Sequence, residues 1–169
     1  MIDVIHQLKL FFEDCYRRIN VREYSRLMGV SPPTASKILF NFEKEGILKR
    51  ENDRNYILYY ANKDSKDFLE FSRIYWRKKL NELIGLFSKN LMSPTIILFG
   101  SLSKAEAKAD SDIDIAIIGV KKKFNLENFE RKLKRKIQIF WIDEIKTSKN
   151  EELLNNILNG YVMEGKLRL

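Results

Sequence analysis

Cysteine and histidine are almost missing from this chain of 169 residues, which has one of each, Cys15 and His6. A single cysteine excludes an intrachain disulfide and a multi-cysteine zinc site. No run approaches the roughly 18 uncharged apolar residues that a membrane-spanning helix needs. The first residues, Met1-Ile2-Asp3, are followed by neither a basic flank nor a small-residue cleavage site. We therefore expect a cytoplasmic protein without a membrane partner.

Positive charge exceeds negative charge, because 31 Lys and Arg stand against 23 Asp and Glu and give a formal net charge of +8. Hydrophobic residues make up 44% of the chain, which excludes a disordered protein. The length allows one domain or two small ones, at about 150 residues per domain. Both halves of the chain are basic, which favours contact with a polyanion.

The first stretch predicts three helices and a hairpin. Apolar residues at helical spacing, Cys15 among them as a buried thiol, indicate a helix over about residues 2–17. Asn20 is the expected N-cap of a second helix, which ends at Gly29. Ser31 is the expected N-cap of a third helix that reaches Glu45. Residues 47–50 and 56–60 then flank a turn-rich segment and predict a hairpin.

This order of elements over residues 2–61 resembles that of winged helix-turn-helix domains. The resemblance implies that the third helix enters the major groove of duplex DNA and that the hairpin lies along the backbone or the minor groove. Polar and basic side chains in these elements are the expected DNA contacts: Ser31, Thr34, Ser36, Lys37, Asn41, Lys49, Arg50 and Arg54. The alternative is a protein-binding winged helix whose cations only solvate a surface.

The segment from about Ser65 to Lys89 predicts one connecting helix that is apolar on two sides. Leu69, Trp76 and Leu80 belong to one stripe, and Phe68 and Tyr75 belong to the other. A helix with two apolar sides must bury both. We expect either a homodimer, as the two-fold geometry of winged-helix readers suggests, or burial between two domains of one chain.

The second stretch contains the residues that indicate chemistry. A strand over residues 94–99 stops at Gly100-Ser101, a short helix is predicted over residues 103–108, and a second strand covers residues 111–118. Asp112 and Asp114 lie on the same face of that strand, because alternate residues share a face. Two neighbouring carboxylates repel each other unless a cation or a proton intervenes. Oxygen ligands of this kind suit Mg²⁺ or Mn²⁺.

Phe99-Gly100-Ser101 followed after ten residues by Asp112-x-Asp114 resembles the signature of DNA polymerase beta-like nucleotidyltransferases, most closely the minimal branch. The likeness covers roughly residues 94–164. It implies that ATP or another nucleoside triphosphate is bound, with nucleotide-binding residues Gly100, Ser101, Lys104 and Ser111 and with Asp112 and Asp114 as catalytic metal ligands. Minimal members are often antitoxins that adenylylate a ribonuclease toxin, so a toxin protein is an expected partner and its tyrosine an expected substrate.

Two positions depart from the family pattern. Ala105 replaces a glycine that is frequent in the turn. Gln138, on the strand predicted over residues 137–142, takes the position of a third carboxylate, and an amide can neither accept the hydroxyl proton nor add charge to a metal site. Either the second metal is weakly held, or Asp143 or Glu144 substitutes, or the site binds nucleotide without transfer. The last case is a transcriptional regulator whose inactive transferase-like domain senses nucleotide.

A helix at about residues 126–135 is expected to present Arg131, Lys132, Lys134 and Arg135 mostly to solvent. A last helix ends at Gly160 and a short strand begins at Tyr161. The fold class that follows is α+β with two domains: a winged helix-turn-helix over 2–62, a connecting or dimerisation helix over 63–91, and a mixed-sheet nucleotidyltransferase domain over 92–169.

Overall fold

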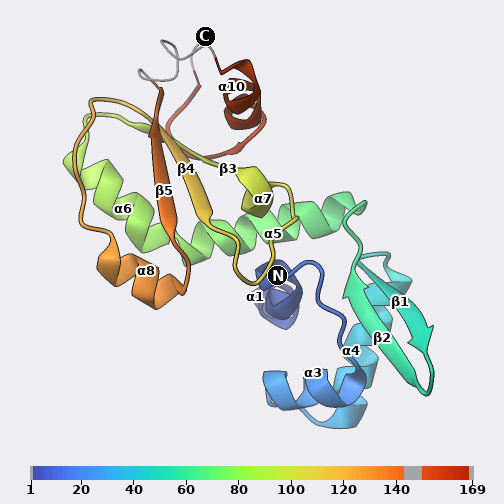
Figure 1. Cartoon of the computed structure of the whole chain (residues 1–169). Coiled ribbons are helices and arrows are strands. Elements are labelled where there is room, and N and C mark those ends of the chain that lie inside the picture. The colour runs from blue at the N-terminus through green and yellow to red at the C-terminus, as the bar shows by residue number, and fades with distance from the viewer. Residues whose placement is uncertain (1, 143–149, 168–169) are drawn as a thin grey trace. The chain divides into compact units, whose positions relative to one another are not determined.

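The computed structural model describes residues 2–142 and 150–167, which form helices and two β-sheets (Figure 1). They divide into two compact units, Met1–Tyr75 with Ala105–Ala109, and Trp76–Lys104 with Asp110–Leu169. A helical N-terminal region and a C-terminal mixed sheet confirm the α+β class. Within the described ranges, no helix has both the length and the apolar character that crossing a membrane requires.

The first unit begins with two short helices, α1 (Ile2–Gln7) and α2 (Lys9–Glu13). The prediction of one helix over residues 2–17 is therefore wrong. Asp14 has extended backbone angles, φ −147° and ψ 98°, and the amide of Cys15 donates to the carbonyl of Ala107 at 2.8 Å. A hydrogen bond to a residue far along the chain thus replaces the intrahelical bond that would have continued the helix.

The two predicted N-caps are confirmed. The Asn20 side chain accepts from the Glu23 amide at 2.9 Å and opens α3 (Val21–Met28), which ends at Gly29 with φ 66°. Ser31 accepts from the Thr34 amide and opens α4 (Pro32–Lys44). Each side-chain oxygen satisfies one amide that has no partner within its helix.

The hairpin consists of β1 (Leu48–Asp53) and β2 (Tyr56–Ala61), which pair antiparallel. The turn between them has two residues. Strand β1 therefore extends to Asp53, past the end at residue 50 that the sequence pattern predicted, and the two strands pair over six residues each. Ile19 forms an isolated antiparallel bridge with Tyr59, with amide-to-carbonyl distances of 3.0 and 2.8 Å. This bridge joins the segment between α2 and α3 to the hairpin.

The predicted connecting helix is divided at Leu80 into α5 (Lys66–Lys79) and α6 (Asn81–Asn90). Leu80 is buried and has ψ 1°, far from the value of about −42° of a regular α-helix. In the first unit, Phe68 and Tyr75 of α5 pack against Phe12 with ring centroids 5.2 and 5.4 Å apart. One of the two apolar stripes is therefore covered within the first unit.

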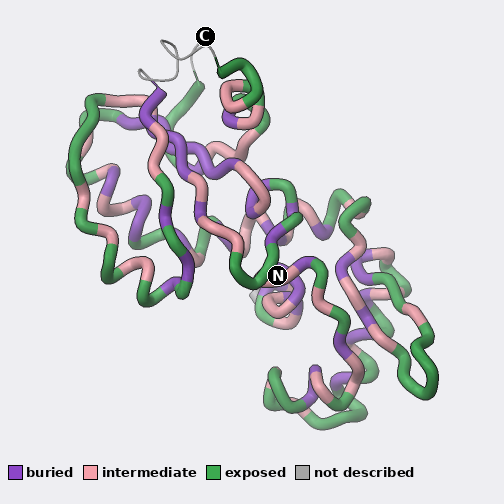
Figure 2. Tube along the Cα trace, viewed as in Figure 1, coloured by how far each residue is buried: buried purple, intermediate pink, exposed green. Residues whose placement is uncertain are grey.

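The second unit is built on a four-stranded sheet in the order β5-β4-β3-β6. Its strands are β3 (Thr95–Phe99), β4 (Ile113–Ile118), β5 (Ile137–Trp141) and β6 (Tyr161–Glu164). Strands β4 and β5 are parallel, and the other pairs are antiparallel. The central strands β3 and β4 contain most of the buried residues of this sheet (Figure 2).

Short helices complete the second unit: α7 (Gly100–Ser103), α8 (Glu127–Leu133) and α10 (Glu151–Leu158). Ile157 of α10 packs with Ile97, Phe99 and Ala116 in a buried cluster. Ala116 lies on the same face of β4 as Asp114, because alternate residues share a face, so α10 packs on the face that also includes Asp114. The prediction of a last helix followed by a strand at Tyr161 is confirmed.

The thiol of Cys15 is buried, and this burial raises its pKa to about 12. At pH 8 only about one molecule in ten thousand then has the reactive thiolate, against a large fraction for a free thiol with a pKa of about 8.5. We expect a disulfide reagent to react with the native protein at least a hundredfold more slowly than with the protein in guanidinium. Equal rates in the two conditions, followed by absorbance of the released thiolate, would contradict the burial.

Candidate active site

The two predicted carboxylates lie at the start of β4, beside the end of β3. Asp114 pairs with Phe99 across the antiparallel ladder and with Gln138 across the parallel one. Asp112 directly precedes β4, and the first residue of β4, Ile113, is buried. The sheet register therefore brings the Gly100-Ser101 turn, the Asp112-x-Asp114 pair and Gln138 to one place.

Gly100 meets a steric and a conformational requirement at the same time. Its φ of 68° lies in the left-handed region, which glycine adopts without strain. A Cβ atom on this residue would collide with Oδ2 of Asp114. The backbone of the turn therefore lies directly against the carboxylate, and a side chain at Gly100 would force this carboxylate to move.

The helix that follows the turn is a single turn of four residues, Gly100–Ser103. The hydroxyl of Ser103 donates to the carbonyl of Gly100 at 2.9 Å and closes it. The predicted helix over residues 103–108 is wrong, because Ala105 has φ 55°, a left-handed conformation that ends helical geometry. A single turn supplies only a small macrodipole, so an anion at this turn would be held chiefly by its amides and hydroxyls.

Burial and the neighbouring Asp112 raise the pKa of Asp114 above its usual range, with burial the larger cause. A raised pKa means that the ionised form costs free energy at this position. A divalent cation held between the two carboxylates would offset that cost. The donor set, two carboxylates and no nitrogen or sulfur ligand beside them among the described residues, fits Mg²⁺ or Mn²⁺.

Gln138 lies where the sequence analysis expected it, next to the carboxylates. Its amide Nε2 donates to Oδ2 of Asp112 at 2.7 Å. The third acidic position of the family pattern is thus filled by a neutral donor that is hydrogen-bonded to one of the two aspartates. Asp143 and Glu144, the proposed substitutes, lie outside the described residues.

Ser111 is held in place by an arginine that the sequence analysis placed on the outside. Arg135 is buried, and its Nη1 donates to the carbonyl of Ser111 at 2.5 Å. Its guanidinium also lies 5.3 Å from the ring centroid of Trp76. Arg135 therefore fixes the backbone immediately before Asp112, and a charged residue in a run of surface cations gives no sequence signal for such burial.

Lys104 is exposed, and its ammonium donates to Oδ1 of Asn156 on α10 at 2.8 Å. Asn156 was not predicted to take part in the site. Since an asparagine carbonyl is a neutral acceptor, this contact orients the lysine without neutralising it. Lys104 directly follows the Gly100–Ser103 turn and is held against α10 by this contact.

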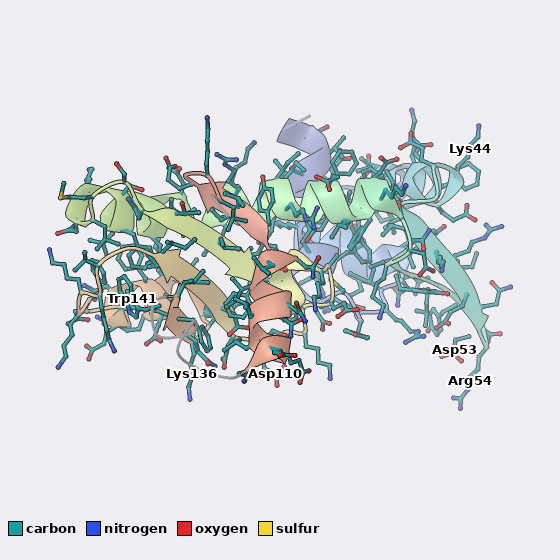
Figure 3. All side chains as sticks on the ribbon, turned by 90° about the horizontal axis from the view of Figure 1, so that it is seen from above. Lys44, Asp53, Arg54, Asp110, Lys136 and Trp141 are labelled. Carbon is teal, nitrogen blue, oxygen red and sulfur yellow. The ribbon has the colours of Figure 1, made fainter. Side chains whose placement is uncertain are left out.

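All eight predicted DNA-contact residues of the first unit are exposed, on α4, at its N-cap or on the hairpin. Two of the cations already have carboxylate partners: Lys49 lies 2.7 Å from Asp64, and Arg50 lies 3.4 Å from Glu43. Arg54 extends from the tip of the hairpin into solvent (Figure 3). No ion pair to Lys37 or Arg54 occurs within residues 2–142 and 150–167.

Two further cations of the first unit were missed by the sequence analysis. Arg22 and Arg26 are exposed on α3, one helical turn apart, and line a shallow cavity together with Tyr56 of β2. Their i, i+4 spacing in the sequence could have predicted that they form a basic pair. It places both guanidinium groups on one side of the helix that precedes α4.

Residues 81–164 match the family model described as "Polymerase beta, Nucleotidyltransferase". This part of the chain is therefore a nucleotidyltransferase-type domain of the polymerase beta kind, and the resemblance drawn from Gly100-Ser101 and Asp112-x-Asp114 is confirmed for the domain. A comparison with curated proteins gives no match.

Two solved structures are similar over about half of this chain. RV1404 from Mycobacterium tuberculosis has 15% identity and a TM-score of 0.41, and the match covers 53% of this chain and 62% of that one. MepR, a transcription regulator of the Staphylococcus aureus multidrug efflux pump MepA, has 16% identity and a TM-score of 0.41, with 52% and 67% covered. The chain thus spans less than two thirds of RV1404, and at these scores neither likeness supports an inference about function.

Substitution of Gly100 by alanine tests the close approach to Asp114. The left-handed backbone alone should cost about 1–2 kcal/mol of unfolding free energy, and the displaced carboxylate should lower Mn²⁺ affinity at least tenfold. Urea denaturation and Mn²⁺ titration measure the two effects. The matched control is Gly85→Ala on α6, where a Cβ meets no atom within 4 Å and where stability should stay equal or rise. Equal behaviour of both variants would refute the role of Gly100.

Proposed function

We propose that the second unit binds a nucleoside triphosphate, ATP or another, with a divalent cation, and transfers its nucleotidyl group to a hydroxyl acceptor. The observation that carries the proposal is the packing of Gly100 against Asp114 beside Ser101. This packing places the backbone amides of the turn and the hydroxyl of Ser101, which can donate to phosphate oxygens, next to two carboxylates. Asp112 and Asp114 would hold the cation, whose charge offsets that of the phosphates.

The chain's own residues have separate roles in this reaction. Lys104 and the Gly100-Ser101 turn orient the triphosphate, and Arg135 keeps the backbone at Ser111 in place. The acceptor oxygen forms a bond to the α-phosphorus, the bond to the bridging oxygen breaks, and pyrophosphate leaves with the electron pair. The hydroxyl proton passes to water, because the neutral Gln138 cannot accept it.

The aspartates are tested with labelled ATP and Mg²⁺ in the presence of hydroxyl acceptors, including a tyrosine-containing ribonuclease toxin if one is encoded beside this protein. We expect the wild-type chain to transfer label and the double variant Asp112→Asn, Asp114→Asn to lose at least a hundredfold of that rate. Autoradiography of the acceptor measures transfer. Equal transfer by both proteins would exclude the assigned site.

A second function is favoured by the hydrogen bond from Gln138 to Asp112. This neutral donor weakens the case for activation of an acceptor, so a site that binds nucleotide without transfer is the competing hypothesis. The protein would then be a transcriptional regulator that senses nucleotide. Nucleotide binding by the wild-type chain without transfer to any acceptor would favour this second function.

We propose further that the first unit is a winged helix-turn-helix that binds duplex DNA. The order α3, α4, β1, β2 and the bridge from Ile19 to the hairpin support this assignment. In such domains the second helix of the pair enters the major groove and the preceding helix crosses the backbone. Exposed Lys37 on α4 and Arg54 on the hairpin have no carboxylate partner within the described part of the chain, so phosphates can bind them without displacing an ion pair.

Lys37→Ala and Arg54→Ala should each weaken DNA binding and lower the slope of log affinity against log salt by about 1. Lys49→Ala should have a smaller effect, because Lys49 is paired with Asp64. Fluorescence anisotropy with a labelled duplex measures both quantities, and Lys66→Ala, an exposed cation at the start of α5, is the control. Absence of salt-dependent binding to any duplex would contradict DNA binding.

A homodimer is part of this proposal, because winged-helix readers commonly bind two half-sites related by a two-fold axis. The stripe of α5 that packs on Phe12 is not the dimer surface, since Phe68 is fully buried there. An autoregulated operon with a toxin partner would combine the two modules in one protein. DNA binding would set transcription, and nucleotidyl transfer would act on the toxin.

A further inference from the structure

The contact between Gln138 and Asp112 limits how many cations this site can hold. A carboxylate only accepts hydrogen bonds, so the amide nitrogen of Gln138 must face Oδ2 of Asp112, as the 2.7 Å distance between them requires. One oxygen of Asp112 is thus engaged by a neutral donor. Gln138 adds no negative charge in return.

The charge at the site is suited to one divalent cation. Asp112 and Asp114 supply two negative charges, and no cluster of three or more carboxylate, histidine or cysteine side chains suited to a metal occurs among the described residues. A pair of cations about 3.5–4 Å apart repel each other, and such sites need carboxylates that bridge or flank both ions. Among the described residues, the ligands at this position are the carboxylate of Asp114 and that of Asp112, one oxygen of which already accepts a hydrogen bond from Gln138.

The pairing of β5 with β4 fixes the backbone of Gln138 beside the two aspartates. Gln138 lies on β5 directly across the parallel ladder from Asp114, and its strand neighbours Ile137 and Ile139 are buried and partly buried. The backbone at Gln138 is fixed by that ladder, while its side chain is exposed. A glutamate at this position would therefore reach the same place with a negative charge, at little cost in folding.

We propose that this site binds one divalent cation with the nucleotide and that Gln138 is the positioning residue that sets this number. The inference rests on the proposed nucleotide site, and it specifies which residue of that site controls the number of bound cations. A site with one cation offsets part of the triphosphate's charge, but it gives the acceptor oxygen no second cation to stabilise it as it attacks. Nucleotide binding is thereby favoured over rapid transfer.

The test counts Mn²⁺ ions bound by the full chain in the presence of a non-hydrolysable ATP analogue, using electron paramagnetic resonance. We expect one tightly bound ion per chain in the wild type, without a spin-coupled signal. Gln138→Glu should bind two ions, with the second at least tenfold tighter than any second ion of the wild type, and should show the coupling of ions about 4 Å apart. Gln138→Asp provides the same charge if the glutamate variant does not fold.

The chain offers a matched control, because its only other glutamine, Gln7, also donates from Nε2 to an aspartate, Asp3, at 3.0 Å. Gln7→Glu makes the same chemical change in the first unit and should leave the count at one. Asp143→Asn with Glu144→Gln should do the same.

Three results would overturn the inference: two coupled ions in the wild type, one ion in both acidic variants at position 138, or a count changed by the Asp143 and Glu144 substitutions. These results leave nucleotide binding intact and so do not touch the proposed function. Failure of the proposed function has a different signature, which is binding of neither Mn²⁺ nor the analogue, or binding unchanged by Asp112→Asn with Asp114→Asn.

Discussion

The site in the second unit depends on the close approach of the Gly100 backbone to the carboxylate of Asp114. The antiparallel pairing of Phe99 with Asp114 brings the two strands together, and the absence of a side chain at Gly100 lets the turn lie against the carboxylate. The proposed nucleotide site follows from that contact. The contact places the turn proposed to bind phosphate next to the two carboxylates proposed to bind the cation, and the raised pKa of Asp114 shows that its negative charge is costly there.

The net charge of +8 is distributed among groups with different functions. Some cations are already satisfied by carboxylates, as Lys49 and Arg50 are, and Arg135 is buried against a backbone carbonyl. Others, such as Lys37 and Arg54, are exposed and have no carboxylate partner in the part of the chain that the structure describes. A count of basic residues therefore indicates a polyanionic partner, but only the ion pairs identify which residues are free to bind it.

The sequence allowed the main features of the fold and the site to be predicted where a local rule decides the outcome. Asn20 and Ser31 act as caps because of their own side chains, and the alternation around Asp112 and Asp114 gives the face on which they lie. Rules of this kind fail where a distant group competes. Helix α2 ends at Glu13 because Cys15 bonds to Ala107, a residue more than ninety positions away.

Burial of charge and backbone strain were also beyond prediction from the sequence. Arg135 stands in a run of basic residues that pattern analysis assigns to solvent, yet packing against Trp76 and the Ser111 carbonyl buries it. Ala105 adopts a left-handed conformation that sequence rules assign to glycine. Both residues lie near the candidate active site in the sequence, where function is expected to keep features that local preference disfavours.

The residues between Gly100-Ser101 and Asp112 also show that each of the two units is not one continuous segment of the chain. Ala105–Ala109 form part of the first unit, where the carbonyl of Ala107 receives the Cys15 amide and Lys108 lies over the ring of Tyr16. Their neighbours along the chain, Lys104 and Asp110, belong to the second unit. A fragment that ended at Tyr75 would therefore lack the acceptor of the Cys15 amide and the lysine that lies over Tyr16. The first unit is complete only when the chain continues through Ala105–Ala109, between Gly100-Ser101 and Asp112.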